Sequence, residues 1–370
     1  MVKLFKLILF FFLYPLKRII TPKNLLIISS NSPNRYGGGP KYLFEYLSKN
    51  NFNCYWLTNN NEIKKHLKFK GFKFFSKNNI FEFFYFLLFS KVVINSGDDH
   101  FDFCDLIEKD KRVIKICVGH GMGPKIINKM KKHPLSYKFN YVSFTSKYTA
   151  NKIAIDQFQI KKNNIKLIGN PKNDIFFNKK KIENLLKKKK IVKFFIPKIS
   201  KNSKVVFYAP TWRRYKMNFP LSYLKNFNLE KFNFFLEKNN LFFLYNSHIQ
   251  AGYEFKRSLS RIKFVSNENY PLFDTNELLC ETDIFCTDCS TLSTEAALLK
   301  KPQIIIFPDY IRYNTKIGFV EPFKKIIPGK FVNSFENFTK IILLYKNRNK
   351  YLKEYNIIIN KYLKNYYDKK

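Results

Sequence analysis

Short apolar runs alternate along the chain with longer stretches in which apolar residues recur every three or four positions. This alternation is typical of a parallel sheet whose strands are joined by helices. In the first half we expect helices at residues 40–49 and 81–89, among others. The expected strands of this half span residues 25–29, 54–58, 92–95, 113–118, 141–145 and 166–168.

A second series of the same kind follows a lysine-rich stretch, residues 178–203, which has little strand pattern. We interpret that stretch as an interdomain helix and linker. The expected strands of the second series span residues 205–208, 241–245, 262–265, 283–286 and 304–307. The pattern therefore predicts two α/β domains joined near residue 190.

The end of the chain has a helical rather than an alternating pattern. Within residues 335–370, apolar side chains share one helix face at Phe338, Ile341, Ile342 and Tyr345. We therefore divide the chain into four parts. These are an apolar N-terminal segment (1–20), an N-terminal Rossmann-like domain (21–190), a C-terminal Rossmann-like domain (191–334) and a helical tail (335–370).

Composition supports two ordinary domains but adds an unusual charge. The chain has 370 residues, 45% of them hydrophobic, and a formal net charge of +40. A surface this basic attracts polyanions and anionic lipid headgroups. The lysines are dispersed rather than concentrated in one recognition helix, so specific nucleic-acid binding is the least favoured interpretation.

The cysteines do not form a metal or disulfide pattern. Cys286 and Cys289 have CxxC spacing, but no second pair or histidine cluster completes a zinc site. We expect Cys286 in a buried strand and Cys289 in the loop after it. Nothing in the spacing requires disulfides, so a reducing cytoplasm is the simplest location.

The apolar N-terminus, LFKLILFFFLYPL at 4–16, is flanked by Lys3, Lys17 and Arg18. It is shorter than the ~20 residues that span a bilayer and lacks a small-residue cleavage site. It fits an interfacial membrane helix with basic flanks, or equally a helix packed on its own domain.

Five short polar segments each follow an expected strand. They are GHGMGPK, GNPKND, YAPTWR, NSH and TDCSTLSTEAALLKKP, beginning at residues 119, 169, 208, 246 and 287. Ligands of open parallel sheets bind at the carboxyl ends of the strands. Two such domains facing each other would gather these segments around one cleft, equipped to hold a diphosphate and to activate a hydroxyl.

Two histidines are the candidate catalytic groups of that cleft. His120 lies between Gly119 and Gly121, where an imidazole could act as general base; a structural loop histidine is the alternative. His248 follows a strand of the second half and could stabilise charge on the transferring group. Lys125, five residues after His120, could neutralise a phosphate.

Hydroxyl, basic and glycine-rich segments complete the candidate site. Ser290 and Thr291 precede a helix and could cap it, bind a phosphate at its positive end, or do both. Arg213 is a natural phosphate partner. The loop 37–39 could approach a phosphate, although it lacks dinucleotide and P-loop spacing. The acidic run at 98–105 is assigned to a solvated loop, and we expect no metal.

Taken in order, these segments resemble those of the CDP-glycerol glycerophosphotransferase family of teichoic-acid-type primases and polymerases. The resemblance covers roughly residues 25–335, from YGGGPKYLFEYL at 36–47 through the segments above to PDYIRY and IIPGKFV. It implies a GT-B fold with two Rossmann-like domains. It also implies transfer of a polyol phosphate, typically glycerol phosphate, to a hydroxyl. The donor would be CDP-glycerol or CDP-ribitol, CMP would be released, and no cofactor would be needed.

The resemblance assigns roles residue by residue. His120 is the implied base and His248 the second catalytic histidine. Donor binding falls to Thr211, Arg213, Asp288, Ser290, Thr291 and Glu295, and contact with phosphate or acceptor to Gly38, Gly39, Lys125, Asn170 and Lys172. The chain departs from the family's pattern at Lys172 (usually Arg), Cys289 (usually Tyr) and Glu295 (usually Asp).

The expected acceptor is a capsule or teichoic-acid-like glycan, free or lipid-linked, used at the cytoplasmic face of the cell membrane. Three other functions stay open. A GT-B glycosyltransferase would use a nucleotide sugar and form a glycosidic bond. A binding protein for anionic surface polymer would release no CMP. A nucleic-acid-binding protein would show strong, salt-dependent affinity for single or double strands.

Overall fold

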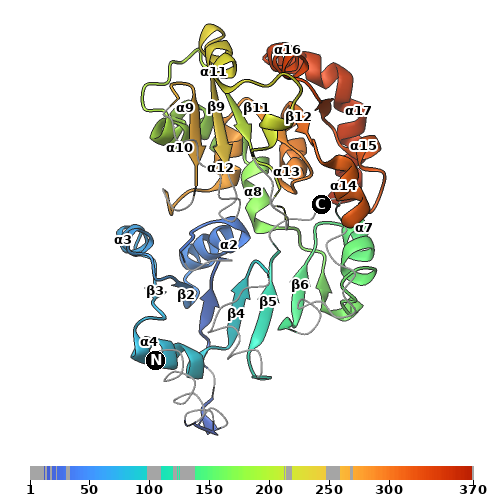
Figure 1. The fold of residues 1–370 in the computed structure, drawn as a ribbon. Helices are drawn as coiled ribbons and strands as arrows, with labels where there is room; N and C mark the ends of the chain where they lie inside the picture. Colours follow the sequence, from blue (N-terminus) through green and yellow to red (C-terminus); the bar gives the residue numbers. More distant parts are fainter. Residues whose placement is uncertain are drawn as a thin grey trace. The chain divides into compact units, whose positions relative to one another are not determined.

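Two parallel β-sheets organise the chain in the computed structural model (Figure 1). The structure describes residues 12, 15–16, 19–21, 23–30, 34–97, 110–119, 123, 125, 138–211, 213, 219–246, 259–266 and 270–368. They form two compact units. The first unit takes the described residues among 1–120, 131–144 and 158–172, and the second takes those among 121–130, 145–157 and 173–370.

The first unit is built on a seven-stranded sheet with the order β3-β2-β1-β4-β5-β6-β7. The strands are β1 (Leu26–Ile28), β2 (Cys54–Leu57), β3 (Phe74–Phe75), β4 (Val92–Asn95), β5 (Ile114–Cys117), β6 (Tyr141–Ser143) and β7 (Ile165–Lys166). Every strand pair is parallel; Leu26, for example, lies opposite Cys54 and Val92. All six strands expected in this half are present, and β3 is an addition.

Three helices of the first unit begin in different ways. In α3 (Asn61–Phe69) and α4 (Ile80–Phe89), the side chains of Asn60 and Asn79 accept hydrogen bonds from first-turn N–H groups. Such caps satisfy donors that have no partner inside the helix. In α2 (Gly38–Lys49), the N-cap is Gly37 and no side chain caps the helix. α2, which follows β1, therefore begins without a side-chain cap.

The lysine-rich stretch 178–203, expected to hold an interdomain helix and a linker, is helical over most of its length and belongs to the second unit. It forms two helices, α9 (Lys179–Lys188) and α10 (Lys190–Phe195), after the short α8 (Asp174–Phe177). Ile191 and Val192 are buried, and the Glu281 carboxylate accepts hydrogen bonds from both of their N–H groups, at 3.0 and 2.9 Å. The stretch is thus anchored in the second unit.

The second unit is built on a six-stranded parallel sheet with the order β10-β9-β8-β11-β12-β13. The strands are β8 (Lys204–Tyr208), β9 (Leu241–Asn246), β10 (Ile262–Val265), β11 (Ile284–Thr287), β12 (Gln303–Ile306) and β13 (Lys330–Val332). The five strands expected here are present, and β13 is an addition. Numbered within the unit, the order is 3-2-1-4-5-6, the order of Rossmann-type sheets.

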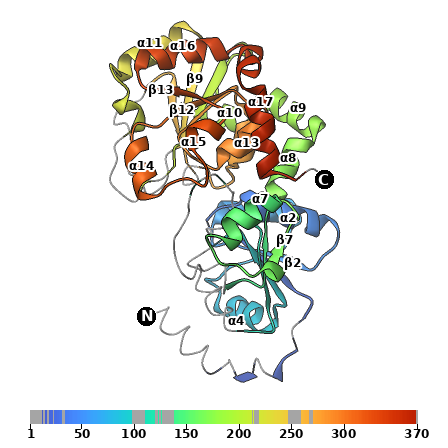
Figure 2. The same cartoon turned by 90° about the vertical axis from the view of Figure 1, so that its right-hand side faces the viewer.

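Helices cover this second sheet, and two of them come from the end of the chain (Figure 2). The remaining helices are α7 (Lys147–Thr149), α11 (Leu229–Lys238), α12 (Thr275–Glu281), α13 (Leu292–Leu298), α14 (Tyr310–Lys316), α15 (Phe323–Ile326), α16 (Phe335–Tyr345) and α17 (Arg348–Tyr366). The apolar face expected in α16 is buried, at Phe338, Ile341, Ile342 and Tyr345. These four side chains share a core with α11 and the sheet.

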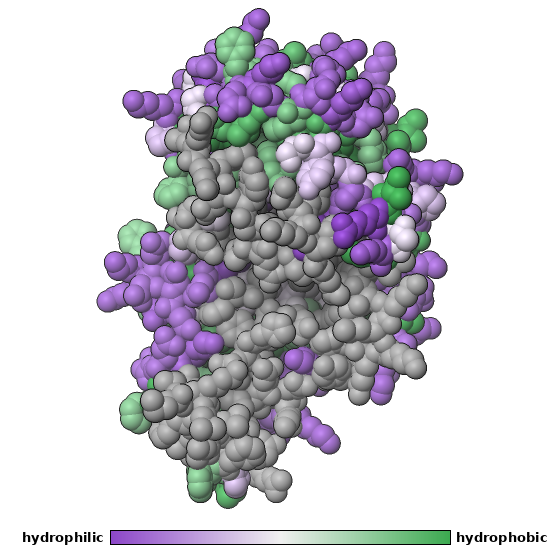
Figure 3. Space-filling view, viewed as in Figure 1, coloured by the Kyte–Doolittle hydropathy of each residue, from purple (hydrophilic) through white to green (hydrophobic). Residues whose placement is uncertain are grey.

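The described surface mixes hydrophilic and apolar residues. On the face shown in Figure 3, hydrophilic residues are spread over the described surface of both units, and apolar residues appear as separate spots among them. Within the described part of the chain, no helix combines the length and the apolar character needed to cross a bilayer. Most of the N-terminal segment 1–20 lies outside the described residues.

Candidate active site

At the carboxyl end of the first sheet, the start of α2 packs closely on two neighbouring loops. A Cβ placed on Gly39 would lie 2.8 Å from Asn170 Oδ1, 3.3 Å from Val118 Cγ2 and 3.6 Å from the Gly119 carbonyl oxygen. Gly38 adopts φ +69°, a left-handed conformation that favours glycine. Any side chain at position 39 would push α2 away from these loops.

Asn170 joins the same loops by hydrogen bonds. Its Nδ2 donates to the Gly119 carbonyl at 3.3 Å, and its Oδ1 accepts from the Lys172 N–H at 3.2 Å. Lys172 is buried as well. Four of the residues predicted to contact phosphate or acceptor, Gly38, Gly39, Asn170 and Lys172, are therefore brought together in the first unit.

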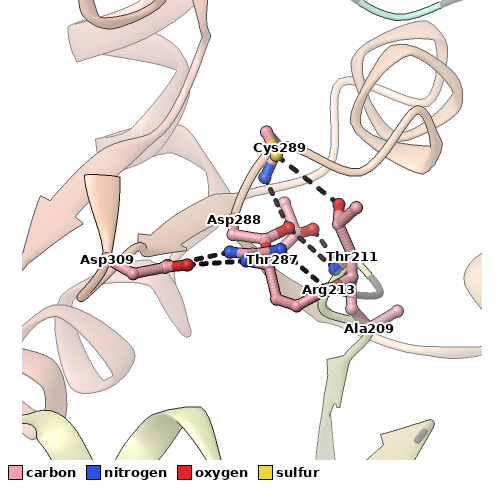
Figure 4. A network of polar contacts seen from close by, with 7 residues as sticks. All are labelled: Ala209, Thr211, Arg213, Thr287, Asp288, Cys289 and Asp309. Atoms are coloured by element: carbon pink, nitrogen blue, oxygen red, sulfur yellow. Dashed lines mark hydrogen bonds and ion pairs between the residues drawn. The ribbon is translucent and has the colours of Figure 1, made fainter. Parts of the chain in front are cut away.

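At the carboxyl end of the second sheet, a buried ionic network is centred on Arg213 (Figure 4). The guanidinium contacts Asp309 through both Nε (2.7 Å) and Nη2 (2.9 Å). Its Nη1 contacts Asp288 Oδ2 at 2.7 Å and donates to the Thr211 carbonyl at 2.8 Å. The ring of Tyr313 lies against it, with the guanidinium carbon 4.7 Å from the ring centroid.

Asp288 is the second centre of this network. Besides Arg213, its carboxylate accepts hydrogen bonds from the backbone N–H groups of Thr211 and Cys289. Thr287, directly before it, donates its hydroxyl hydrogen to the Ala209 carbonyl at 2.8 Å. The loops that follow β8 and β11 are thereby tied together.

Electrostatics keep the network ionic. Burial alone would lower the pKa of Arg213, but the charges of Asp288 and Asp309 outweigh it and hold that pKa above its usual range. Burial, with Asp288 adding to it, raises the pKa of the Cys289 thiol to about 12. Cys289 is therefore a neutral packing residue and not a nucleophile, because nucleophilic attack needs the thiolate.

The start of α13 carries the hydroxyls predicted to bind the donor. Ser290 Oγ accepts a hydrogen bond from the Leu292 N–H at 3.3 Å, whereas Thr291, the N-cap, makes no capping side-chain hydrogen bond. Glu295 lies deeper in the helix and is buried. Burial and then the Glu295 carboxylate raise the pKa of Tyr367, at the end of α17. Glu295 therefore lies near that phenol.

The segment just after His120 lies against this helix start, within the second unit. A Cβ on Gly123 would lie 2.9 Å from Thr291 Cγ2 and 3.3 Å from Thr291 Cα. Lys125 pairs with Phe319 in an isolated antiparallel bridge, and its charge lowers the pKa of Cys289 against the larger effect of burial. Gly123 thus lies against Thr291, and the charge of Lys125 acts on Cys289, directly before Ser290.

The predicted site is described in part. His120 and His248 lie outside the described residues, as do the acidic positions 98–105. Asp309 was not predicted as a site residue, although it lies in the PDYIRY segment. Its position directly after an expected strand was the signal that could have identified it. Over the described ranges, no group of three or more His, Cys, Asp or Glu side chains could hold a metal ion.

Comparison with known proteins places the chain among enzymes of wall polymer synthesis. Residues 10–370 match the family model described as CDP-Glycerol:Poly(glycerophosphate) glycerophosphotransferase. The teichoic acid glycerol-phosphate primase of Bacillus subtilis is 30% identical over 72% of this chain and 71% of its own length. The teichoic acid ribitol-phosphate polymerase TarK of Staphylococcus aureus is 28% identical over 56% of this chain and 40% of its own length.

Two solved structures share the fold. The wall teichoic acid polymerase TagF superposes with a TM-score of 0.74 at 19% identity, covering 98% of this chain and 93% of its own. The UDP-GlcNAc 2-epimerase from Neisseria meningitidis superposes with a TM-score of 0.55 at 15% identity, covering 92% of this chain and 100% of its own. With the two Rossmann-type sheets, these similarities confirm the predicted GT-B-like fold class.

Proposed function

The chain belongs to the CDP-glycerol:poly(glycerophosphate) glycerophosphotransferase family, and from that premise we propose that it transfers glycerol phosphate from CDP-glycerol to a hydroxyl of a capsule or teichoic-acid-like glycan, releasing CMP. The enzyme is a phosphotransferase of cell-envelope synthesis. The acceptor, the release of CMP and the roles of individual residues are the parts that we propose.

The main structural support for this proposal is the close approach of Gly123 to Thr291. Gly123 follows His120 by three residues, and it leaves no room for a side chain against the start of α13. Gly123 of the GHGMGPK segment therefore lies against the helix start that we propose to hold the donor. Lys125 brings a cation to the same place, where the pKa of Cys289 responds to its charge. A diphosphate needs a cation and N–H or O–H donors together.

The proposed reaction is an in-line displacement at phosphorus. His120 takes the proton of the acceptor hydroxyl, and the oxygen attacks the phosphorus distal to cytidine. A new phosphorus–oxygen bond forms as the bond to the bridging oxygen breaks, and CMP leaves with that electron pair. His248, Lys125 and the Ser290–Thr291 hydroxyls stabilise the charge on the leaving phosphate. Such transfers depend mainly on positioning and electrostatics.

CDP-ribitol is the second candidate donor, because one of the relatives is a ribitol-phosphate polymerase. Ribitol is the longer polyol, so the same diphosphate site would serve either donor while the polyol pocket differs. Both donors would give a phosphodiester and CMP, and a panel containing both separates them.

We also place the enzyme at the cytoplasmic face of the membrane, on a lipid-linked acceptor. The net charge of +40 favours anionic lipid surfaces. The exposed Ile19, at 82% of its surface, and Phe12, at 75%, continue the apolar pattern of the N-terminal segment. Removal of residues 1–20 should reduce co-flotation with anionic vesicles and leave CMP release from a water-soluble acceptor intact.

The test is CMP release by the purified full-length chain, given CDP-glycerol, CDP-ribitol and a nucleotide sugar in parallel with a crude glycan acceptor. We expect release from one CDP-polyol and a loss of about 10²–10⁴-fold in His120→Ala, with donor affinity retained, because a general base contributes that much. Full activity in His120→Ala would remove the base assignment. Release from the nucleotide sugar alone would replace the function by glycosyl transfer.

A further inference from the structure

We propose that Asp309 and Arg213 are positioning residues, which lock three loops into the arrangement that binds the donor. This inference rests on the proposed function. It also replaces the direct contact between Arg213 and a donor phosphate that the sequence predicts. Asp309 has no role in any of the preceding assignments.

The three loops come from neighbouring strands of the second sheet. Thr211 and Arg213 follow β8, Asp288 follows β11, and Asp309 follows β12. In the sheet these strands lie side by side in the order β8-β11-β12. One guanidinium therefore spans three adjacent strand ends, contacting Asp309 on one side and Asp288 with the Thr211 carbonyl on the other (Figure 4).

The hydrogen-bonding capacity of Arg213 is nearly used up by these contacts. A guanidinium has five N–H donors, and the contacts to Asp309, Asp288 and the Thr211 carbonyl use four of them. The side chain is only 5% exposed, and the ring of Tyr313 covers it. A donor phosphate at Arg213 would have to displace a carboxylate from a buried bidentate pair.

Charge points the same way. Two carboxylates, 2% and 12% exposed, flank the one guanidinium, so the positive charge of Arg213 is compensated within the cluster. Arg213 therefore offers a diphosphate little attraction. The cluster instead holds Asp288, whose carboxylate orients the backbone of Cys289, one residue before the hydroxyls of Ser290 and Thr291. Its effect on the donor would pass through that loop.

Asp309→Asn separates the two roles of Arg213. If Arg213 bound phosphate directly, removal of the opposing charge would leave donor affinity unchanged or improve it. If Arg213 positions the loops, the loss of the charged bidentate pair should let the loop after β11 shift. We then expect the KM for the CDP-polyol to rise about tenfold or more with a much smaller change in kcat.

The measurement is the KM and kcat of CMP release for Arg213→Lys, Asp309→Asn, their double variant and Asp309→Glu. We expect the double variant to be no worse than Arg213→Lys alone, since both remove one interaction, and Asp309→Glu to recover part of the affinity. Asp283→Asn is the matched control, because Asp283 pairs with Lys204 at 2.8 Å at the opposite end of the same sheet. It should leave KM unchanged.

Unchanged or tighter donor binding in Asp309→Asn, with loss of binding in Arg213→Lys, would overturn the proposal. Thermal unfolding of the same four proteins supplies a second readout that needs no donor. The shifts in Tm for positions 213 and 309 should be strongly non-additive, and additive shifts would also overturn it. If the unaltered enzyme releases no CMP from any donor, the proposed function fails. The Tm shifts of the single and double variants would still show whether Arg213 and Asp309 act together in holding the loops.

Discussion

The carboxyl ends of the two sheets are built by opposite means. In the first unit, glycines let the start of α2 touch the loops at Gly119 and Asn170, and the contacts are neutral. In the second unit, Arg213, Asp288 and Asp309 tie the loops with buried charges. Close packing fixes the distance between the helix and the loops but tolerates no added atoms. A buried ion pair fixes the orientation of the charged side chains, and the loss of one partner costs much stability.

The two edges should therefore be sensitive to different substitutions. A larger side chain should disturb the first edge most, and the loss of a charge should disturb the second edge most. The helix starts at the two edges differ as well. No side chain caps α2, whereas in α13 the hydroxyl of Ser290 accepts a hydrogen bond from the first N–H group.

The largest expected effect comes from removal of a charge at the second edge. Asp288→Ala would leave Arg213 without one of its two carboxylates and the Thr211 N–H without its acceptor. We expect a loss of about 3–5 kcal/mol in the free energy of unfolding, measured with urea. A loss below about 1 kcal/mol, the size typical of exposed ion pairs, would show that the network is not fixed by charge.

The dependence of stability on pH tests a second buried carboxylate of the second unit, Glu281, which has no cationic partner in the contacts described above. Burial raises the pKa of Glu281 from its ordinary 4.5 to about 7. Its Oε2 accepts hydrogen bonds from the N–H groups of Ile191 and Val192, and no guanidinium is involved in these bonds. A raised folded-state pKa gives stability that is complete below about pH 4.5 and is lost as the pH rises through about 7.

The variant Glu281→Gln cannot ionise and should remove this dependence. The raised pKa of Glu281 corresponds to a decrease on the order of 3 kcal/mol in the free energy of unfolding between pH 4.5 and 8. We expect the unfolding free energy of the unaltered protein to fall over this range by more than that of Glu281→Gln. Parallel pH profiles of the two proteins would mean that Glu281 is ionised as readily as an exposed carboxyl.

The smallest effect on stability is expected at the first edge. In Gly39→Ala the new Cβ would meet Asn170 Oδ1 at 2.8 Å, which should cost about 1–3 kcal/mol and reduce turnover. Gly71→Ala is the matched control. Gly71 has φ +68° with nothing within 4 Å of the added Cβ, so about 1 kcal/mol is lost without an effect on turnover. Equal turnover in the two variants would contradict a site at this edge.

Local pattern was enough to predict most of the fold. Every expected strand is present, because buried parallel strands are short apolar runs whatever surrounds them. Two further strands, β3 with two residues and β13 with three, were not expected from the pattern. For residues 178–203 the sequence predicts a helix and a linker, but not the hydrogen bond between Ile191 and Glu281, 90 residues away.

The site was predictable in its positions but not in its contacts. Strand ends located Thr211, Asp288, Ser290 and Thr291 correctly at one sheet edge, since parallel strands all end on the same side. The partner of Arg213 is 96 residues away along the chain, and no local signal pairs an arginine with one carboxylate among several. The sequence therefore predicts Arg213 as a phosphate ligand and does not reveal its ion pairs.

The most direct test of the central claim is the bond in the product. The full-length enzyme would be given CDP-glycerol and acceptor, and the polymer examined by phosphorus NMR together with the release of CMP. We expect a new phosphodiester signal in proportion to CMP, absent in His120→Ala. A product joined through a glycosidic bond from a nucleotide sugar, with no phosphodiester from CDP-glycerol or CDP-ribitol, would contradict it.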